Sequence, residues 1–209
     1  MAEADILTFE QMRLVVVVYS SAIIPLLLIP YLSWKKIIPS WVIVVYMISF
    51  IACAFGWEIW FTYGLFEGDN VNMRRASQLS MAIPMHINWI LNSLADAGTI
   101  CIGGLFLTWR ILSRNNEIFK KWDWSVFFIL LFIFIGQNIF VEVFLYHDQL
   151  SNDKLLSWAP FSPLGHWINP ILFKFSDRTV SLQSQIPWLI MTPLLYGFLI
   201  YYLKHNKYD

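Results

Sequence analysis

The feature that most constrains this chain is a set of apolar segments, each long enough to cross a membrane. A helix of about 20 apolar residues spans the hydrocarbon core of a bilayer. Backbone polar groups find no water there, so such a segment must be helical. The sequence therefore predicts an all-α, polytopic membrane bundle with five transmembrane helices: Leu14–Leu32, Trp41–Leu65, Ile83–Leu107, Trp124–Tyr146 and Ile186–Leu203.

Composition supports a single integral-membrane domain over residues 1–209. Of these residues, 58% are hydrophobic and 13% are charged, which is more apolar than an ordinary soluble domain. The spans and their short connections use the whole chain, so no separate soluble domain is expected. The formal net charge is zero, which provides no basic surface for nucleic acid. Cys53 and Cys101 lie in apolar runs and are expected to be small buried side chains.

The segment Trp158–Phe175 is apolar but interrupted. Its sequence, WAPFSPLGHWINPILFKF, contains three prolines and one glycine. Proline lacks the backbone donor that a continuous helix needs. We therefore expect a re-entrant or interfacial segment here, with a sixth span as the alternative.

Basic residues orient the bundle, because an odd number of spans places the two termini on opposite sides. The side of the C-terminus has Lys35, Lys36, Arg110, Arg114, Lys120, Lys121, Lys204 and Lys207, and the other side has Arg13, Arg74, Arg75, Lys154, Lys174 and Arg178. Lysine and arginine are enriched in cytoplasmic connections. The excess predicts a cytoplasmic C-terminus, in a bacterial inner membrane or in the endoplasmic reticulum.

Three carboxyl groups, those of Glu58, Asp96 and Glu142, lie inside predicted spans that contain no lysine or arginine. An ionisable group at membrane depth is costly and indicates a functional role by default. Without a neighbouring cation, desolvation favours the neutral acid over the carboxylate. A neutral carboxylic acid inside the membrane is a proton donor.

Amide side chains recur at helical spacing beside these acids. Asn88 and Asn92 precede Asp96 at intervals of four residues, and Glu142 follows an asparagine at the same interval, so each set lies on one helix face. Neighbouring spans run in opposite directions, which places Glu58, the two asparagines and Glu142 in one half of the bilayer. We expect a pocket that opens towards that leaflet. The alternative is that these polar groups hydrogen-bond across helices and hold the bundle together.

Tryptophans accompany the acids. Trp57 and Trp60 flank Glu58, Trp89 lies in the third span and Trp188 opens the last one. Tryptophan is also common in belts at the membrane interface, which is the simpler explanation for many aromatic residues. However, aromatic faces stabilise a cation that has no anion beside it. A proton donor among such faces suits protonation of an alkene or epoxide to give a carbocation.

The segment FGWEIWFTYG, Phe55–Gly64, resembles the Trp-Glu motif in the second helix of the small membrane-bound terpene cyclases of meroterpenoid pathways. The resemblance implies that Glu58 is an acid catalyst. The fungal members of that group also carry an aspartate in their last helix, whereas Ile186–Leu203 contains no acid.

The second half of the chain is similar to the emopamil-binding-protein family, which includes the sterol Δ8-Δ7 isomerase. The similarity lies in Asp96 with Trp109 thirteen residues later, in GQNIFVEVFLYHD at Gly136–Asp148, and in Gln185 with Trp188. Ala54 stands where that family has a histidine, and Gln185 stands where it has an asparagine. Both families protonate double bonds of isoprenoids or steroids.

We therefore expect a metal-independent, class II-type terpene cyclase in which Glu58 and Asp96 are catalytic. The expected substrate-binding residues are Trp57, Trp60, Asn88, Trp89, Asn92, Asn138, Glu142, Gln185 and Trp188. The expected partners are a lipophilic isoprenoid substrate and membrane lipids. No aspartate-rich motif for magnesium diphosphate is present, so neither a metal nor another cofactor is implied. The alternatives are a sterol-isomerase-like shift of a double bond, and proton-coupled transport or lipid binding.

Overall fold

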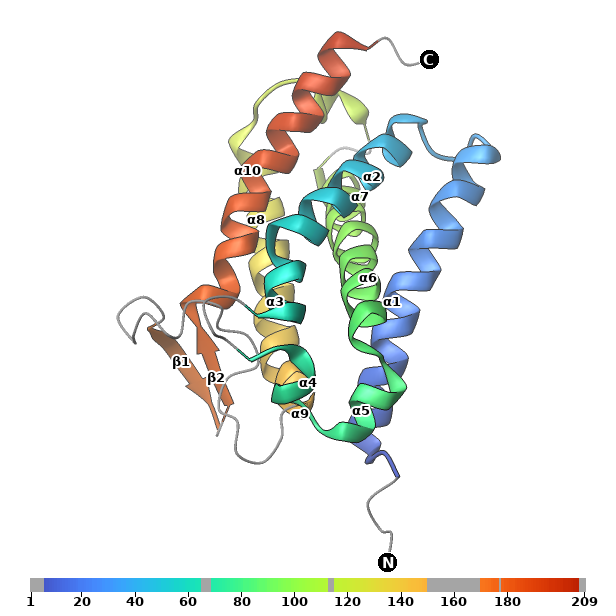
Figure 1. Ribbon diagram of the computed structural model, residues 1–209. Coiled ribbons are helices and arrows are strands. Elements are labelled where there is room, and N and C mark those ends of the chain that lie inside the picture. The colour runs from blue at the N-terminus through green and yellow to red at the C-terminus, as the bar shows by residue number, and fades with distance from the viewer. Residues whose placement is uncertain (1–5, 65–68, 113–114, 150–169, 177, 207–209) are drawn as a thin grey trace, which may run out of the picture.

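The computed structural model describes residues 6–64, 69–112, 115–149, 170–176 and 178–206. This part of the chain forms a bundle of five long helical spans with a β-hairpin at one end (Figure 1). The spans are Phe9–Trp34, Trp41–Tyr63, Met85–Leu112, Trp124–Gln149 and Leu182–His205, and each is apolar and long enough to cross a membrane. The predicted all-α membrane bundle with five spans is thus confirmed.

The first and last spans are the continuous helices α1 (Phe9–Trp34) and α10 (Leu182–His205). Each of the other three consists of two α-helices joined by a π-helical turn. These are α2 (Trp41–Cys53), the turn Ala54–Glu58 and α3 (Ile59–Tyr63); α6 (Met85–Ala95), the turn Asp96–Ile102 and α7 (Gly103–Leu112); and α8 (Trp124–Val141), the turn Glu142–Tyr146 and α9 (His147–Gln149). Between the spans lie α4 (Val71–Arg74), α5 (Ser77–Ala82) and the 3₁₀ helix Asn116–Phe119.

Side-chain caps fix where two of the spans begin. Thr8 Oγ1 accepts a hydrogen bond from the Gln11 N–H at 3.3 Å, and Gln11 Oε1 accepts one from the Thr8 N–H at 3.0 Å. This reciprocal capping box starts α1 five residues before the predicted Leu14. Asp123 Oδ1 accepts from the Ser125 N–H at 2.7 Å and caps α8 at its predicted start.

Two glycines let the third span approach its neighbours closely. A Cβ atom added at Gly98 would lie 2.4 Å from the Cβ of Pro25 in α1. One added at Gly104 would lie 2.5 Å from the ring of Phe134 in α8. Small residues permit such close helix contacts in membrane bundles. The third span therefore packs tightly against both α1 and α8.

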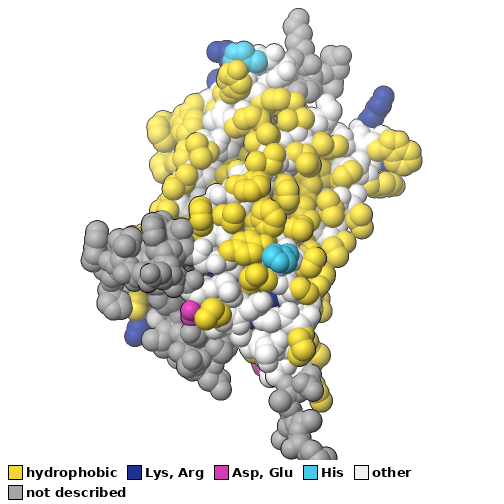
Figure 2. All heavy atoms as spheres, viewed as in Figure 1, with side chains coloured by type: hydrophobic (Ala, Val, Ile, Leu, Met, Phe, Trp, Pro, Cys, Tyr) yellow, Lys and Arg dark blue, Asp and Glu magenta, His cyan; other side chains and the backbone are white. Residues whose placement is uncertain are grey.

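Buried apolar side chains from all five spans form the main core. Tyr46, Phe134 and Tyr196 are among its largest members. Cys53 and Cys101 are free thiols buried in the same core, as expected from their apolar surroundings. The outer surface is also apolar, and hydrophobic side chains cover most of the face seen in Figure 2. A surface of this kind matches a lipid environment.

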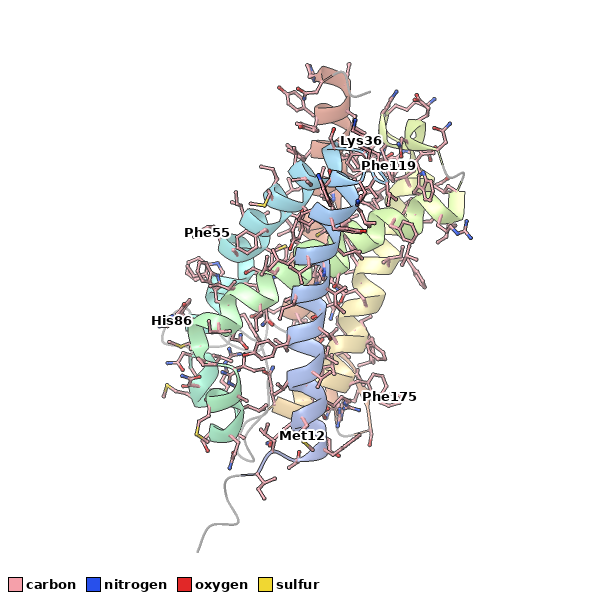
Figure 3. All side chains as sticks on the ribbon, turned by 90° about the vertical axis from the view of Figure 1, so that its right-hand side faces the viewer. Met12, Lys36, Phe55, His86, Phe119 and Phe175 are labelled. Atoms are coloured by element: carbon pink, nitrogen blue, oxygen red, sulfur yellow. The ribbon has the colours of Figure 1, made fainter. Side chains whose placement is uncertain are left out.

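Viewed from the side, the first span runs the full height of the bundle. Met12 lies near one end of this span and Lys36 just beyond the other (Figure 3). Phe55 and His86 both point outwards in this view and are both exposed. Lipid-facing and inward-facing residues can therefore be told apart along the second and third spans.

The hairpin was not predicted from the sequence. Strand β1 (Ile171–Phe175) pairs antiparallel with β2 (Arg178–Ser181), with Lys174 opposite Thr179. All residues of β1 are exposed. The expected re-entrant, interfacial or sixth spanning segment covered 158–175. Residues 158–169 of it lie outside the described residues, but the part from Ile171 onwards is a strand and not a transmembrane helix. Since β2 leads directly into α10, the hairpin helps to fix the start of the last span.

Candidate active site

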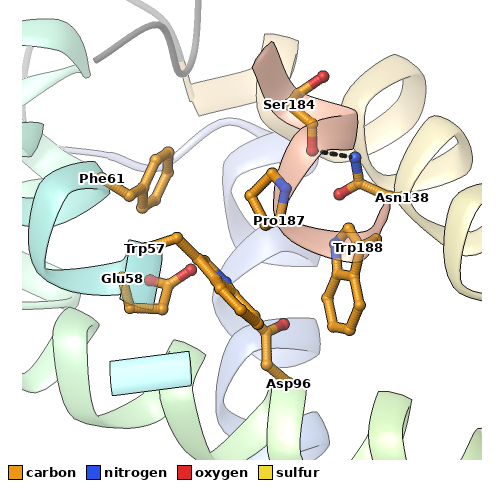
Figure 4. Close-up of a pocket in the computed structure, with 8 residues that line it drawn as sticks. All are labelled: Trp57, Glu58, Phe61, Asp96, Asn138, Ser184, Pro187 and Trp188. Carbon is orange, nitrogen blue, oxygen red and sulfur yellow. Dashed lines mark hydrogen bonds between the residues drawn. The ribbon is translucent and has the colours of Figure 1, made fainter. Parts of the chain in front are cut away.

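A cavity opens among the second, third, fourth and fifth spans. Its residues are Trp57, Glu58, Phe61, Asp96, Asn138, Ser184, Pro187 and Trp188 (Figure 4). The empty volume is about 280 Å³, the open mouth included. Because that figure includes the open mouth and the gaps between atoms, the enclosed space is much smaller, and an isoprenoid must displace part of the wall. Two of the three intramembrane acids, Glu58 and Asp96, thus line one cavity, half of whose residues are polar.

Each intramembrane acid lies at the boundary of a π-helical turn. Glu58 is the last residue of its turn, while Asp96 and Glu142 are the first residues of theirs. A π turn inserts one extra residue and so changes the face to which the following side chains point. Such turns are rare and occur frequently at functional sites. Regular helical spacing could not have predicted these orientations.

Glu58 is buried and only partly satisfied. Its Oε2 atom has no hydrogen-bond partner among the described residues, and the side chain of Asn92 is its hydrogen-bonding neighbour on the third span. Arg74 also interacts electrostatically with Glu58. The Arg74 guanidinium donates to the carbonyl of Phe61 and lies 4.8 Å from the centre of the Phe61 ring. The second span, Trp41–Tyr63, contains no lysine or arginine, as predicted, and Arg74 belongs to α4 outside the spans.

Asp96 is held by a tryptophan. The indole Nε1–H of Trp57 donates to Asp96 Oδ2 at 2.8 Å. The Trp57 ring also lies 5.4 Å from the ring of Trp188, which in turn lies 5.3 Å from Phe134. Trp57 therefore orients one acid and at the same time belongs to the aromatic wall of the cavity.

Glu142 has a different environment. Its Oε1 accepts from the N–H and hydroxyl of Ser181, at 3.1 and 3.2 Å. Its Oε2 accepts from Ser184 Oγ at 2.5 Å and from Gln185 Nε2 at 2.9 Å. Four donors thus satisfy this carboxyl group, and it does not line the cavity. It ties the fourth span to β2 and to the start of α10.

Asn138 connects this network to the cavity. Its Nδ2 donates to the backbone carbonyl of Ser184 at 2.8 Å and to Gln185 Oε1 at 3.0 Å. Gln185 therefore lies between Glu142 and Asn138, behind the cavity wall. Asn138 and Trp188 reach the cavity as predicted, whereas Gln185 and Glu142 support the wall from outside it.

Three further residues expected in the pocket lie elsewhere. Trp60 is 39% exposed on the outer surface. Trp89 donates from Nε1 to the carbonyl of Ala54 at 2.9 Å, which joins the second and third spans. Asn88 accepts from Arg75 at 3.0 Å. None of the three lines this cavity, and their role in substrate binding stays a prediction.

Arg75 is the buried partner of Asn88 and connects α4 and α5 to α6. It also donates to Ser80 and Asn72, at 3.2 and 3.3 Å, and to the carbonyl of Ile83. Burial lowers the pKa of Arg75 to about 10, so the side chain is still a cation at neutral pH. Its contacts are structural, and it lies outside the cavity.

Phe61, Ser184 and Pro187 were missed as cavity residues. Phe61 follows Glu58 by three residues, and Ser184 precedes Trp188 by four, so helical spacing could have identified both. Pro187 carried no such signal, because a proline in an apolar run is not recognisable as a wall residue. Among the described residues, no group of three His, Cys, Asp or Glu side chains is placed to hold a metal ion.

Comparison of the chain with protein-family models, with curated proteins and with solved structures gives no match. The function must therefore be inferred from the cavity and from the motifs that line it.

Proposed function

We propose that this chain is a membrane-embedded acid catalyst of the terpene-cyclase type, which protonates an isoprenoid and guides cyclisation of the resulting carbocation. The observation that carries the proposal is the cavity that Glu58 and Asp96 share with Trp57 and Trp188. It combines a proton source with aromatic walls inside the membrane, where the substrate dissolves.

Glu58 is the proton donor of the proposed pair. The Trp57 N–H bonds to Asp96, and such a donor favours the carboxylate form of its acceptor. Glu58 and Asp96 also interact electrostatically, and two carboxylates in one buried site cannot both ionise at low cost. Glu58 therefore holds the proton, and its Oε2 has no acceptor among the described residues that would compete with the substrate.

The reaction begins when the Glu58 O–H bond breaks and the proton bonds to an alkene carbon or an epoxide oxygen. Protonation of an alkene leaves a carbocation on its second carbon, and a protonated epoxide gives one when its C–O bond breaks to form a hydroxyl group. A second double bond of the substrate attacks this carbocation to close a ring. Loss of a proton from the carbon beside the final cation forms a new double bond. That proton passes to a carboxylate of the pair or to water, so the atoms balance without a further reactant.

The aromatic wall stabilises the cation. Trp57 and Trp188 present π faces to a cavity that contains no protein anion other than the acid pair. A cation over an aromatic face gains about 0.5–2 kcal/mol, and more when water is excluded. The resemblance of Phe55–Gly64 to the membrane-bound terpene cyclases supports the same assignment, because its Trp-Glu pair is the part that lines the cavity.

The test is conversion of isoprenoids by the purified full chain in detergent, with a chelator present and in deuterated buffer. Candidates are farnesylated and geranylgeranylated compounds, with and without a terminal epoxide, and sterols. Protonation at carbon gives a product that is heavier by about one unit than the product formed in water, because a carboxyl proton exchanges with solvent between turnovers. An epoxide places the label on oxygen, where it washes out.

The products also separate the alternatives. A new ring supports the cyclase, whereas a shifted double bond with the ring count unchanged identifies an isomerase. A ligand that always returns chemically intact and unlabelled overturns acid catalysis and favours transport or lipid binding. Loss of every reaction on addition of chelator contradicts the metal-independent route.

The proposal includes an orientation, with the end of α10 on the cytoplasmic side. The end of α1, which Lys35 and Lys36 follow, lies at the same end of the bundle as the end of α10 (Figure 1), and cytoplasmic connections are rich in lysine and arginine. A reporter fused to the C-terminus, active only in the cytoplasm, tests this orientation.

A further inference from the structure

The amide of Asn138 in the cavity wall is bonded through its nitrogen only, among the described residues. Asn138 is only 3% exposed, and its Nδ2 donates to the Ser184 carbonyl and to Gln185 Oε1. The Oδ1 atom of the same amide accepts no hydrogen bond from any described residue. In Figure 4 it lies on the side of the amide that faces Pro187 and Trp188, away from the bonded nitrogen.

The orientation of this amide is fixed by its partners. A backbone carbonyl can only accept, so the atom of Asn138 that lies 2.8 Å from the Ser184 oxygen must be the nitrogen. Gln185 gives the same answer independently. Its nitrogen bonds to Glu142, so its oxygen faces Asn138 and requires a donor there. The hydrogen bonds from Glu142 through Gln185 to Asn138 thus leave the Asn138 Oδ1 atom facing the cavity.

The Oδ1 atom is not among the fully enclosed unpaired polar atoms of the described residues, so it is open to a group inside the cavity. A ligand that covers this acceptor without offering a donor loses about 1–3 kcal/mol. The other lining residues are apolar, aromatic or acidic except Ser184, whose hydroxyl group donates to Glu142 and to the Ser181 carbonyl. A ligand that brings a hydroxyl group to Oδ1 therefore completes this site, while a pure hydrocarbon leaves it unsatisfied.

We infer that Asn138 Oδ1 accepts a hydrogen bond from a hydroxyl group of the substrate, so that the cavity selects isoprenoid alcohols or phenols over hydrocarbons and ethers. The isoprenoid part of this inference rests on the proposed function. Asn138 belongs to the fourth span, whereas the acids belong to the second and third spans. The hydroxyl is thus anchored on a different wall from the proton donor, which positions the double bond at Glu58. Asn138 is a specificity-determining residue in this arrangement.

The experiment measures equilibrium binding of radiolabelled geraniol and geranyl methyl ether to the purified full chain in detergent. The two probes share a carbon skeleton, but the ether cannot donate a hydrogen bond. We expect geraniol to bind roughly tenfold more tightly, as a hydrogen bond to an otherwise unpaired buried acceptor implies. Asn138→Leu should abolish the preference mainly by weakening geraniol.

Gln137→Leu is the matched control. Gln137 is the adjacent amide on α8, and its side chain donates to the Phe134 carbonyl at 3.0 Å without reaching the cavity. This variant should keep the full preference for the alcohol. A preference that persists unchanged in a folded Asn138→Leu protein overturns the inference. If that variant does not fold, the wild-type comparison decides, since equal binding of the two probes also overturns it.

Binding and turnover separate this inference from the proposed function. Glu58→Gln should keep the preference for geraniol, because the proton is not part of the anchor. A hydroxyl preference that depends on Asn138, without conversion of any isoprenoid, supports the anchor and removes the acid catalysis. Conversion of hydrocarbons and alcohols with equal efficiency supports acid catalysis and overturns the hydroxyl anchor at Asn138.

Discussion

The two clusters of carboxyl groups inside this bundle differ in how well they are satisfied. Glu142 accepts four hydrogen bonds from Ser181, Ser184 and Gln185. Glu58 is equally buried, yet its Oε2 has no partner among the described residues. Both acids lie at π-helical turns, Glu58 in the second span and Glu142 in the fourth, so the local backbone does not distinguish them.

The difference indicates which acid is structural and which is catalytic. A fully bonded carboxyl group joins elements together, and removing it leaves several buried donors unpaired. A poorly bonded carboxyl beside a cavity inside the membrane costs stability in the resting protein, and its presence is explained if it reacts. The comparison therefore predicts opposite effects of mutation at the two sites.

The largest expected effect is on turnover at Glu58. Glu58→Gln should lower the rate of isoprenoid conversion by about 10²–10⁴-fold, because the amide keeps the shape but has no acid proton to transfer. Asp96→Asn should also lower the rate strongly, since the Trp57 donor would lose its carboxylate partner. Rates are measured with an identified substrate, alongside the midpoint of thermal unfolding.

Stability provides the control for these amide variants. The unfolding midpoint of Glu58→Gln should remain close to that of the wild type, because Oε2 loses no hydrogen bond among the described residues. Near-native turnover in both amide variants would contradict the acid-catalysis account.

The next effect is on stability at Glu142. Glu142→Leu should destabilise the protein by roughly 3 kcal/mol or more, because the donors of Ser181, Ser184 and Gln185 lose their acceptor. Glu142→Gln, which keeps one acceptor oxygen, should be milder in both stability and turnover. The free energy of unfolding in mixed detergent micelles measures the difference. A Glu142→Leu protein of wild-type stability that has lost all turnover would reverse the two roles.

A smaller effect on kcat is expected to distinguish Trp188 from Trp60, which were both predicted to bind the substrate. Trp188 is 3% exposed on the cavity, whereas Trp60 is 39% exposed on the outer surface. Trp188→Leu should lower kcat about tenfold through the lost π face, and Trp188→Phe should restore most of it. Trp60→Leu should change kcat by less than about twofold, as an outward-facing site implies. Equal losses at the two positions would show that the aromatic wall has no specific role.

The fold was largely predictable from the sequence, because helical spans follow from apolar length alone. The predicted start at Trp124 agrees with α8, and the number of spans agrees with the five observed. The hairpin was not predictable from the same argument. Ile171–Phe175 is apolar like a helix segment, and only pairing with Arg178–Ser181 makes it a strand. Such pairing depends on contacts that local composition does not encode.

The site was predictable only in part. Glu58, Asp96 and Trp188 were identified because acids and tryptophans stand out in apolar runs, and they do share the cavity. Trp60 and Asn88 lie away from the cavity, because Trp60 is exposed on the outer surface and Asn88 is bonded to Arg75, which lies outside the spans. Whether these residues perform the proposed chemistry is a separate question, and the variants above address it.

The most direct test of the central claim needs no substrate. A protonated carboxyl group has an infrared C=O stretching band distinct from that of a carboxylate, and isotope-shifted difference spectra of the purified protein at neutral pH can assign it. The account predicts a protonated-acid band that disappears in Glu58→Gln and persists in Glu142→Gln. A band that persists in Glu58→Gln and disappears in Glu142→Gln would contradict the account, because the available proton would then lie in the cluster described as structural.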